Sequence, residues 1–290
     1  MVKILVLGAS GMLGNAMLRV LHEHEGLDVF GTVRSSDVER FFPAKVSERL
    51  ITGVDVENQD ALLNVFCQVC PKVVINCVGL VKQVAEASDP LRTIPVNALL
   101  PHRLARLCDV SGARLVHIST DCVFSGEEGS YTELDLADAR DLYGVSKYLG
   151  EVNYPGTITL RTSAIGHALN NSSGLVDWFL GQQGQCRGFT RAVFSGLPTV
   201  VLAQIVRDVI IPESELHGLY HIAAEPIAKF DLLKLVAEAY GKTIEIIPDN
   251  SLQIDRSLNG GCFRAATGYV APEWPELVRV MHSYYLKVVN

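Results

Sequence analysis

The 290-residue sequence predicts an α/β protein with a doubly wound parallel sheet and a smaller, discontinuous α+β lobe. Apolar runs rich in β-branched residues alternate with segments of helical periodicity through the first half of the chain. These runs are continuously apolar, which is typical of parallel strands that are covered on both faces. Beyond residue 166 the pattern is less regular and richer in Gly, Gln and Arg, which indicates the second lobe.

The predicted elements follow the order of a strand–helix–strand fold. The predicted strands lie at 3–8, 27–34, 50–56, 72–79 and 113–120. The predicted helices lie at 12–24, 60–70 and 97–112, and Gly112 closes the last of them. A helix at 198–211 and a strand at 218–224 are expected to return to the first sheet, and further helices are expected at 229–242 and 271–285.

Composition excludes several classes of protein. A formal net charge of −7 argues against a nucleic-acid-binding protein. We expect no secretory signal and no membrane span, because no apolar stretch approaches the required ~18 residues. Seven cysteines scattered along the chain favour a reducing cytoplasm. Cys67 and Cys70 form a C-x-x-C pair, but without further ligands we expect buried thiols and no metal site.

A glycine-rich turn, VLGASGMLG, joins the first predicted strand to the first predicted helix. A dinucleotide pyrophosphate requires a tight turn, a backbone without Cβ atoms and the positive end of a helix. The spacing is G-x-x-G-x-x-G rather than G-x-G-x-x-G, and a structural turn is the alternative. The position between strand and helix favours a dinucleotide on a Rossmann sheet. The cofactor-binding residues expected in this turn are Gly8, Ser10, Gly11, Met12, Leu13 and Gly14.

The end of the second strand indicates which nicotinamide cofactor binds. A carboxylate there would bond the ribose 2′-hydroxyl, whereas an arginine would accept a 2′-phosphate. Arg34 is followed by two serines, and the first carboxylate is Asp37. This pattern predicts NADPH and leaves NADH open; a solvated arginine is the alternative. Asp55 and Val56, at the end of the third predicted strand, are expected near the adenine, although Asp55 could instead cap the next helix.

Tyr143 and Lys147 are four residues apart in DLYGVSK, so a helix would place them on one face. An adjacent ammonium lowers the pKa of a phenol, which is otherwise near ~10, because it favours the phenolate. A chance pair on a helix surface is the alternative. Ser119 and Thr120 place hydroxyls at the carboxyl end of the fifth strand, where ligands of open α/β sheets bind.

Five motifs in order carry a family resemblance: the glycine turn, NCVG, STDCVFSG, YGVSK and LRTS. With them the chain resembles the extended short-chain dehydrogenase/reductase superfamily. Within it, STDCVFSG and GLYHIA are most similar to the dTDP-4-dehydrorhamnose reductases and related nucleotide-sugar 4-keto reductases. The resemblance covers nearly the whole chain and is strongest through residue 166.

The resemblance implies roles for matching residues. Tyr143 would be the general acid that protonates the carbonyl oxygen, Lys147 would lower its pKa and hold the nicotinamide ribose, and Thr120 would bond the carbonyl. Tyr143, like Lys147, would also contact the cofactor, and four further residues would hold the cofactor or the backbone around it: Asn76, Cys77, Val78 and Asn97. The expected dinucleotide-binding domain spans 1–166 with a return segment near 197–223. The expected substrate-binding lobe spans 167–196 and 224–290.

The substrate is less well defined by the sequence. Cys122 stands where the rhamnose enzymes commonly carry an aromatic residue, which leaves the sugar open. A diphosphate-linked sugar requires cationic partners, and we expect Arg191 and Arg256 to serve. Lys82 and Gln83 are expected at the pocket mouth, where they would meet the sugar. Ordinary solvated side chains are the alternative for all four.

The predicted function is NADPH-dependent reduction of a dTDP- or UDP-linked 4-keto-6-deoxy sugar in deoxysugar and surface polysaccharide biosynthesis. An epimerase of the same superfamily is one alternative. A non-catalytic regulatory subunit resembling that of methionine adenosyltransferase is another. A 4,6-dehydratase is disfavoured, because Asp121 and Cys122 follow Thr120 in place of an Asp–Glu pair. The resemblance also allows a homodimer.

Overall fold

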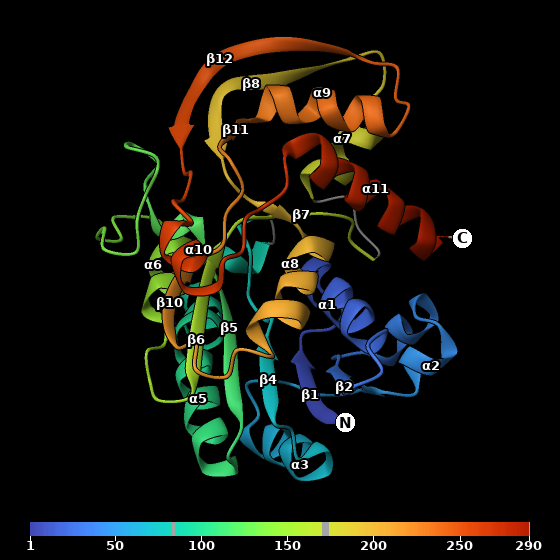
Figure 1. Cartoon of the computed structure of the whole chain (residues 1–290), viewed down its shortest axis with the longest axis vertical. Helices are drawn as coiled ribbons and strands as arrows, with labels where there is room; N and C mark the ends of the chain where they lie inside the picture. The colour runs from blue at the N-terminus through green and yellow to red at the C-terminus, as the bar shows by residue number, and fades with distance from the viewer. Residues whose placement is uncertain (83–84, 170–173, 290) are drawn as a thin grey trace. The chain divides into compact units, whose positions relative to one another are not determined.

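The computed structural model of the chain describes residues 1–82, 85–169 and 174–289 (Figure 1). The chain divides into two compact units. Unit 1 comprises Met1–Ser119, Arg140–Leu160 and Ala203–Leu219, and unit 2 comprises Thr120–Ala139, Arg161–Leu202 and Tyr220–Asn290. The functional domain boundaries given above remain a prediction. No helix among the described residues has the length and apolarity needed to span a bilayer.

A seven-stranded sheet organises unit 1, with the order β10-β6-β5-β4-β1-β2-β3. Its strands are β1 Val2–Leu7, β2 Leu27–Thr32, β3 Leu50–Ile51, β4 Val73–Asn76, β5 Arg114–Thr120, β6 Thr157–Thr162 and β10 Gly218–His221. The neighbouring pairs from β3 to β5 are all parallel. The predicted parallel Rossmann sheet is confirmed, and β10 lies beside β6 as expected of the returning strand.

Helical segments connect these strands. They are α1 Met12–His22, η1 Ser36–Phe41, α2 Ala44–Ser47, α3 Gln59–Val69, η2 Ala85–Ser88, α4 Pro90–Thr93, the π-helical η3 Ile94–Leu99, α5 Leu100–Ser111, η4 Asp121–Val123, α6 Leu142–Leu149, α8 Thr199–Ile205 and the π-helical η5 Val206–Ile210. The helices predicted at 12–24, 60–70, 97–112 and 198–211 are therefore confirmed, although two of them contain π-helical turns.

The third predicted strand is shorter than 50–56. Strand β3 ends at Ile51, and Gly53 has a φ of +73°, a conformation that an extended strand does not contain. The chain turns there, and Val54 donates its backbone N–H to the Val33 carbonyl at 3.1 Å.

Strand β1 is buried on both faces. Leu5 and Leu7 pack with α3 and α5 in one core cluster. Ile4 and Val6, which alternate with them along the strand, are also fully buried. This double burial explains why the strand is apolar at every position rather than at every second one.

The strand order reverses between β1 and β4, which are adjacent in the sheet (Figure 1). The connections that leave their carboxyl ends run to α1 and toward α4, on opposite sides of this point. Ligands of doubly wound sheets bind in the crevice at such a switch point. The fold therefore places the β1–α1 turn and the segment after β4 where a cofactor is expected.

Unit 2 contains a three-stranded sheet with the order β11-β8-β12. Strands β7 and β9 form a separate two-stranded sheet. The strands and helices of this part of the chain are β7 Ala164–Ile165, α7 Leu175–Gly181, β8 Gln185–Phe194, β9 Leu197–Pro198, β11 Ile227–Ala228, α9 Lys229–Ala239, β12 Glu245–Asp255, α10 Gly261–Thr267 and α11 Trp274–Val289. Strands β8 and β12 pair in parallel with a register shift between Asp249 and Gln253. The helices expected at 229–242 and 271–285 are present as α9 and α11.

Candidate active site

The β1–α1 turn exposes bare backbone at the start of a helix. Gly8 has a φ of +80°, and a Cβ atom on it would lie 3.0 Å from the Val78 side chain. A Cβ atom on Gly14 would lie 2.0 Å from the Gly8 carbonyl oxygen. Gly11 occupies the N-cap of α1 and donates its N–H to the Gly8 carbonyl at 3.0 Å. The turn thus has the tightness, the missing Cβ atoms and the helix N-terminus that a pyrophosphate requires.

The other residues predicted to bind the cofactor in this turn lie just before α1 or in its first turn. Ser10, Met12 and Leu13 are half-buried, and Met12 is the first residue of α1. The turn is anchored to the neighbouring strand, because Ala9 donates its N–H to the Thr32 carbonyl at 3.0 Å. The residues of the glycine turn therefore fit the diphosphate of a dinucleotide.

The adenosine side of the predicted cofactor site is open to solvent. Arg34 is exposed, two residues beyond the end of β2. Asp55 is exposed, and its Oδ1 accepts the Glu57 N–H at 3.0 Å. The alternative that Asp55 caps the next helix is wrong, because the Asn58 side chain caps α3. Val56 is half-buried and packs against the core cluster of unit 1.

Asn76 at the end of β4 is fully buried and shapes the backbone that follows. Its Oδ1 accepts the Val78 N–H at 3.1 Å, and its Nδ2 lies 3.1 Å from Nδ1 of His117. Burial lowers the pKa of His117 well below its usual range, and the positive Lys147 and His102 act in the same direction. A neutral His117 can accept the Asn76 amide proton. Asn76 therefore holds the segment containing Cys77 and Val78, rather than pointing its amide at a ligand.

Asn97 joins three parts of the site in unit 1. It lies in the π-helical turn η3 and is buried. Its Oδ1 accepts the Leu80 N–H at 2.9 Å, and its Nδ2 donates to the Leu80 carbonyl at 3.0 Å and to Ser146 Oγ at 3.2 Å. This side chain fixes the segment after β4 against α6, so it supports the site through the backbone.

Helix α6 carries Tyr143 and Lys147. Lys147 is only 5% exposed, and its Nζ donates to the Ile118 carbonyl at 2.8 Å. Burial lowers the pKa of Lys147 from 10.5 to about 8, although the Glu151 carboxylate and Cys77 act in the opposite direction. Burial also raises the pKa of the Cys77 thiol to about 12. Tyr143 is half-buried one turn before Lys147.

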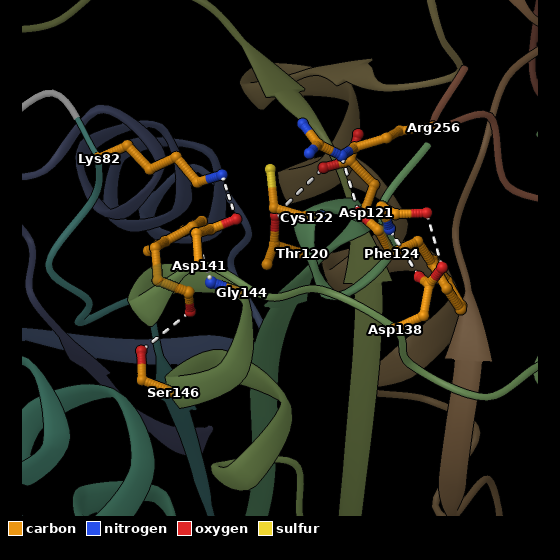
Figure 2. A network of polar contacts seen from close by, with 12 residues as sticks. Lys82, Thr120, Asp121, Cys122, Phe124, Asp138, Asp141, Gly144, Ser146 and Arg256 are labelled. Carbon is orange, nitrogen blue, oxygen red and sulfur yellow. Dashed lines mark hydrogen bonds and ion pairs between the residues drawn. The ribbon is translucent and has the colours of Figure 1, made fainter. Parts of the chain in front are cut away.

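Lys82 belongs to the segment after β4 and contacts the first turn of α6, a contact that its position in the sequence did not indicate. Its Nζ is 2.8 Å from Oδ2 of Asp141 (Figure 2). The same atom lies 5.7 Å from the centre of the Tyr143 ring. Asp141 caps α6, with its Oδ1 accepting the Gly144 N–H at 3.0 Å. Gln83 lies outside the described residues.

Thr120 belongs to unit 2, where it ends β5 and begins the short helix η4. Its Oγ1 accepts the Cys122 N–H at 3.1 Å and donates to Oδ1 of Asp121 at 3.2 Å (Figure 2). Asp121 is buried, and burial raises the pKa of its carboxyl group. Hydrogen bonds from Cys122, Thr120 and Ser163 and the positive Arg256 oppose this rise in part. A buried carboxyl group therefore lies directly beside the predicted carbonyl-binding hydroxyl.

The two arginines predicted to bind phosphate are held differently within unit 2. Arg191 is exposed on β8. Arg256 is half-buried just beyond β12, and its Nε donates to the Phe124 carbonyl at 2.8 Å (Figure 2). The backbone N–H of Arg256 donates to the Val193 carbonyl of β8 at 3.0 Å. Arg191 and Arg256 therefore both lie along the β8–β12 strand pair.

The C-x-x-C pair is placed differently from the prediction. Cys67 and Cys70 are exposed rather than buried, because the buried face of α3 is made by Leu62, Val65, Phe66 and Val69. All seven cysteines are free thiols. In the described ranges, no group of three or more His, Cys, Asp or Glu side chains is arranged to hold a metal ion.

The low pKa of Lys147 predicts a pH-dependent stability. Between about pH 8 and 10.5 the unfolded chain retains a Lys147 proton that the folded protein has released. The free energy of unfolding of the parent should therefore rise with pH across this window relative to Lys147→Met, by up to about 3 kcal/mol. Urea denaturation of both proteins at pH 7, 8.5 and 10 measures this. A constant difference between them would show that the ammonium is not desolvated.

Comparisons with known proteins place this geometry in a family. Over 177 residues the chain is 33% identical to the Haloferax volcanii protein named probable low-salt glycan biosynthesis reductase Agl14; the match covers 59% of this chain and 56% of that protein. It is 25% identical over 261 residues to the dTDP-4-dehydrorhamnose reductase of Aggregatibacter actinomycetemcomitans, covering 86% and 83%. It is also 25% identical over 257 residues to methionine adenosyltransferase 2 subunit beta of Danio rerio, covering 82% and 74%. The chain thus spans little more than half of the first relative and most of the other two.

The fold is shared with solved structures. The dTDP-4-dehydrorhamnose reductase of Bacillus anthracis in complex with NADP matches with a TM-score of 0.79 and 19% identity, over 98% of this chain and 99% of that one. The family model described as the RmlD substrate binding domain matches residues 2–256 of the sequence. The chain belongs to the RmlD substrate binding domain family.

Proposed function

We propose that this protein is an NAD(P)-dependent oxidoreductase that reduces the keto group of a nucleotide-linked 4-keto-6-deoxy sugar. The observation that carries the proposal is the α6 pair, in which a buried Lys147 ammonium lies one turn from Tyr143. The glycine turn in the same unit fits a dinucleotide. The relative from Aggregatibacter, which is named a dTDP-4-dehydrorhamnose reductase, supports this reaction class.

The bound nicotinamide cofactor would supply the hydride. In this scheme Tyr143 donates its phenolic proton to the sugar oxygen on which negative charge develops. Lys147 favours the phenolate that remains, because its positive charge lies in a low-dielectric environment. Thr120 would donate its hydroxyl proton to the same oxygen and would release the hydrogen bond that it makes to Oδ1 of Asp121 in the free protein. Asn76 and Asn97 keep the backbone of the strand ends and of α6 in place.

NADPH is the proposed cofactor, and exposed Arg34 is the proposed partner of its 2′-phosphate. A hydrogen bond to a charged group contributes about 1.5–3 kcal/mol, so Arg34→Ala should weaken NADPH binding roughly 10–100-fold. NADH affinity should change little, because NADH has no 2′-phosphate. Fluorescence titration with both cofactors measures the ratio, and an equal loss for both would refute the assignment.

The sugar nucleotide is proposed to carry dTDP or UDP. Arg191 and Arg256 remain the proposed diphosphate partners, and their location on one strand pair supports a shared role. Direct contact of Lys82 with the sugar also remains a prediction, and the experiments below address it. We further propose that the protein forms a homodimer. We also propose that it works in the cytoplasm, because its seven free thiols fit a reducing compartment.

Two other functions are tested by the same assay. An epimerase would use the same pair while regenerating its cofactor in each cycle. A regulatory subunit is favoured by the likeness to methionine adenosyltransferase 2 subunit beta. Retention of Thr120, Tyr143 and Lys147 together supports an enzyme over a binding subunit.

The test is to mix purified protein with NADPH and a panel of dTDP- and UDP-linked 4-keto sugars. A substrate-dependent loss of absorbance at 340 nm is expected of the reductase. A new sugar without net loss of NADPH would identify an epimerase. No product with any sugar, in protein that still binds NADPH, would favour the binding subunit.

A further inference from the structure

An ion pair lies beside the proposed catalytic tyrosine in unit 1. The Nζ atom of Lys82, from the segment after β4, is 2.8 Å from Oδ2 of Asp141. The same Nζ lies 5.7 Å from the centre of the Tyr143 ring, within the ~6 Å at which a cation and an aromatic face attract. Residues 59 positions apart in the sequence are thereby joined at one end of α6.

Asp141 fixes this cation relative to the helix. It is the N-cap of α6, and its two oxygens have different partners: Oδ1 accepts the Gly144 N–H, and Oδ2 accepts from Lys82. Because the cap residue is set by the helix backbone, the Lys82 ammonium is held against the first turn. Tyr143 is the second residue of that turn, so the geometry brings the lysine close to the tyrosine ring.

The Lys82–Asp141 pair is exposed to solvent, whereas the other lysine near Tyr143 is buried. The Lys82 and Asp141 side chains are 38% and 44% exposed, whereas Lys147 on the same helix is buried. Among the described residues of unit 1, the other charged or titratable groups on or against this helix are Tyr148, Glu151, Cys77, His117, His102, which contacts the Leu149 carbonyl, and, on α4, the exposed Arg92. The Cys77 thiol and the His117 imidazole are neutral at physiological pH because burial disfavours their charged forms.

We propose that Lys82 is a positioning residue for Tyr143: paired with Asp141, it orients the phenol ring and supplies a second positive charge beside it. The proposal rests on the function proposed above only in assigning Tyr143 as the proton donor. In this arrangement Tyr143 lies under the influence of two cations. The buried Lys147 acts on the phenol only below about pH 8, where it keeps its proton, and the charge of the exposed Lys82 is offset by Asp141.

The two members of the pair should therefore act in opposite directions. Lys82→Met removes the positive charge and leaves Asp141, which should raise the pKa of Tyr143. Asp141→Asn keeps the helix cap, since Asn and Asp cap equally well, but leaves Lys82 unopposed and should lower that pKa. For unit charges about 6 Å apart, Coulomb's law gives a shift of about half a pH unit at the dielectric constant of water and about two units at the effective value near a protein surface, so each shift should fall between these limits. A purely structural role would not produce shifts of opposite sign.

The first experiment needs no substrate. The absorbance of phenolate at 295 nm is followed against pH in the parent, Lys82→Met and Asp141→Asn proteins. The same titration is made after adding Tyr143→Phe to each of the three, and the difference within each pair is the titration of Tyr143. Opposite shifts in the two variants are expected. Unchanged titrations, or shifts of the same sign, would overturn the proposal. Because the readout is the free protein, its result is independent of whether the protein is a reductase.

The second experiment uses the reductase assay. Lys82→Met should lower kcat several-fold with a smaller change in KM, and Lys82→Arg should restore most of the loss. A rise in KM alone, with an unaltered Tyr143 titration, would instead assign Lys82 to direct sugar contact. The matched control is Arg49→Met in unit 1, because Arg49 also pairs with a carboxylate, Asp28, and lies 4.9 Å from the ring centre of Phe30. That variant should change neither measurement.

Discussion

Replacing Tyr143 by Phe is expected to lower kcat/KM by about 10²–10⁴-fold. Proton transfer by a positioned side chain contributes a factor of this size, and Phe has the same ring without the acidic proton. The measurement is NADPH oxidation in the presence of whichever 4-keto sugar nucleotide the parent enzyme reduces. NADPH affinity should fall far less than turnover, because the glycine turn and Arg34, which lie elsewhere in the chain, would still bind the cofactor.

The helix around this residue should survive the change. Asp141 still caps α6, Lys147 still donates to the Ile118 carbonyl, and Ser146 still accepts from Asn97. The loss of activity should therefore occur without a comparable loss of stability. A large fall in melting temperature would point instead to a structural role for the phenol.

The matched control for this variant lies on the same helix. Tyr148→Phe removes the same atom from a side chain that is 44% exposed, and its activity should equal that of the parent. If Tyr143→Phe retained near-parental turnover, the assignment of the proton donor would be refuted. If Tyr148→Phe were equally impaired, the loss would belong to α6 as a whole and not to the phenol at Tyr143.

Local patterns predicted the sheet and the glycine turn because their causes are local. Strand β1 is apolar at each position from Ile4 to Leu7, and this requires burial on both faces. Gly14 is needed because a Cβ atom there would meet the Gly8 carbonyl, and Gly8 is needed because its φ is +80°, so both constraints arise within seven residues of sequence. The i, i+4 spacing of Tyr143 and Lys147 is likewise a property of one helix.

The support of the site depends on long-range contacts, which no sequence pattern marked. Ser146 meets Asn97 across 49 residues, and Lys82 meets Asp141 across 59. An available signal was overlooked: Asp141 stands three residues before Gly144, which is the spacing of a helix cap. Tertiary folding selects the partner of such a carboxylate, so the sequence could indicate the cap but not Lys82.

The strands of the small sheet in unit 2 were also missed. Strand β8 alternates imperfectly between exposed and buried positions and includes Gly188, Arg187 and Arg191. Strand β12 is mostly exposed, contains Pro248 and is interrupted by a register shift. A strand that is partly exposed and irregular has neither the continuous nor the alternating apolar pattern on which the prediction depended.

Gly14→Ala is expected to destabilise the protein and to abolish tight NADPH binding. Helix propensity alone predicts the reverse, since Ala is favoured over Gly in a helix by about 1 kcal/mol. The added Cβ atom would lie 2.0 Å from the Gly8 oxygen and 2.8 Å from its carbonyl carbon. Because these are backbone atoms, the turn must move, at a cost of roughly 1–3 kcal/mol or more. The clash therefore outweighs propensity.

Cofactor affinity should fall with this movement, because the backbone N–H groups of the turn would no longer point at the pyrophosphate. Losing one charge-assisted hydrogen bond weakens binding about 10-fold or more. Calorimetric titration with NADPH and thermal melting of the free protein measure the two effects separately. Gly181→Ala in α7 is the control, since nothing lies within 4 Å of its added methyl group. It should leave both measurements at parental values or slightly raise the melting temperature.

Gly11→Ala distinguishes a packing requirement from a ligand requirement in the same turn. Its Cβ atom would lie 3.4 Å from the Gly8 oxygen, an ordinary contact, so the fold should lose less than about 1 kcal/mol as an N-cap effect. The methyl group would nevertheless cover exposed backbone at the start of α1, where the pyrophosphate is proposed to bind. We therefore expect Gly11→Ala to melt like the parent and to bind NADPH weakly. If it bound NADPH normally, the bare backbone at Gly11 would not be the phosphate site, and the glycines of this turn would serve packing alone.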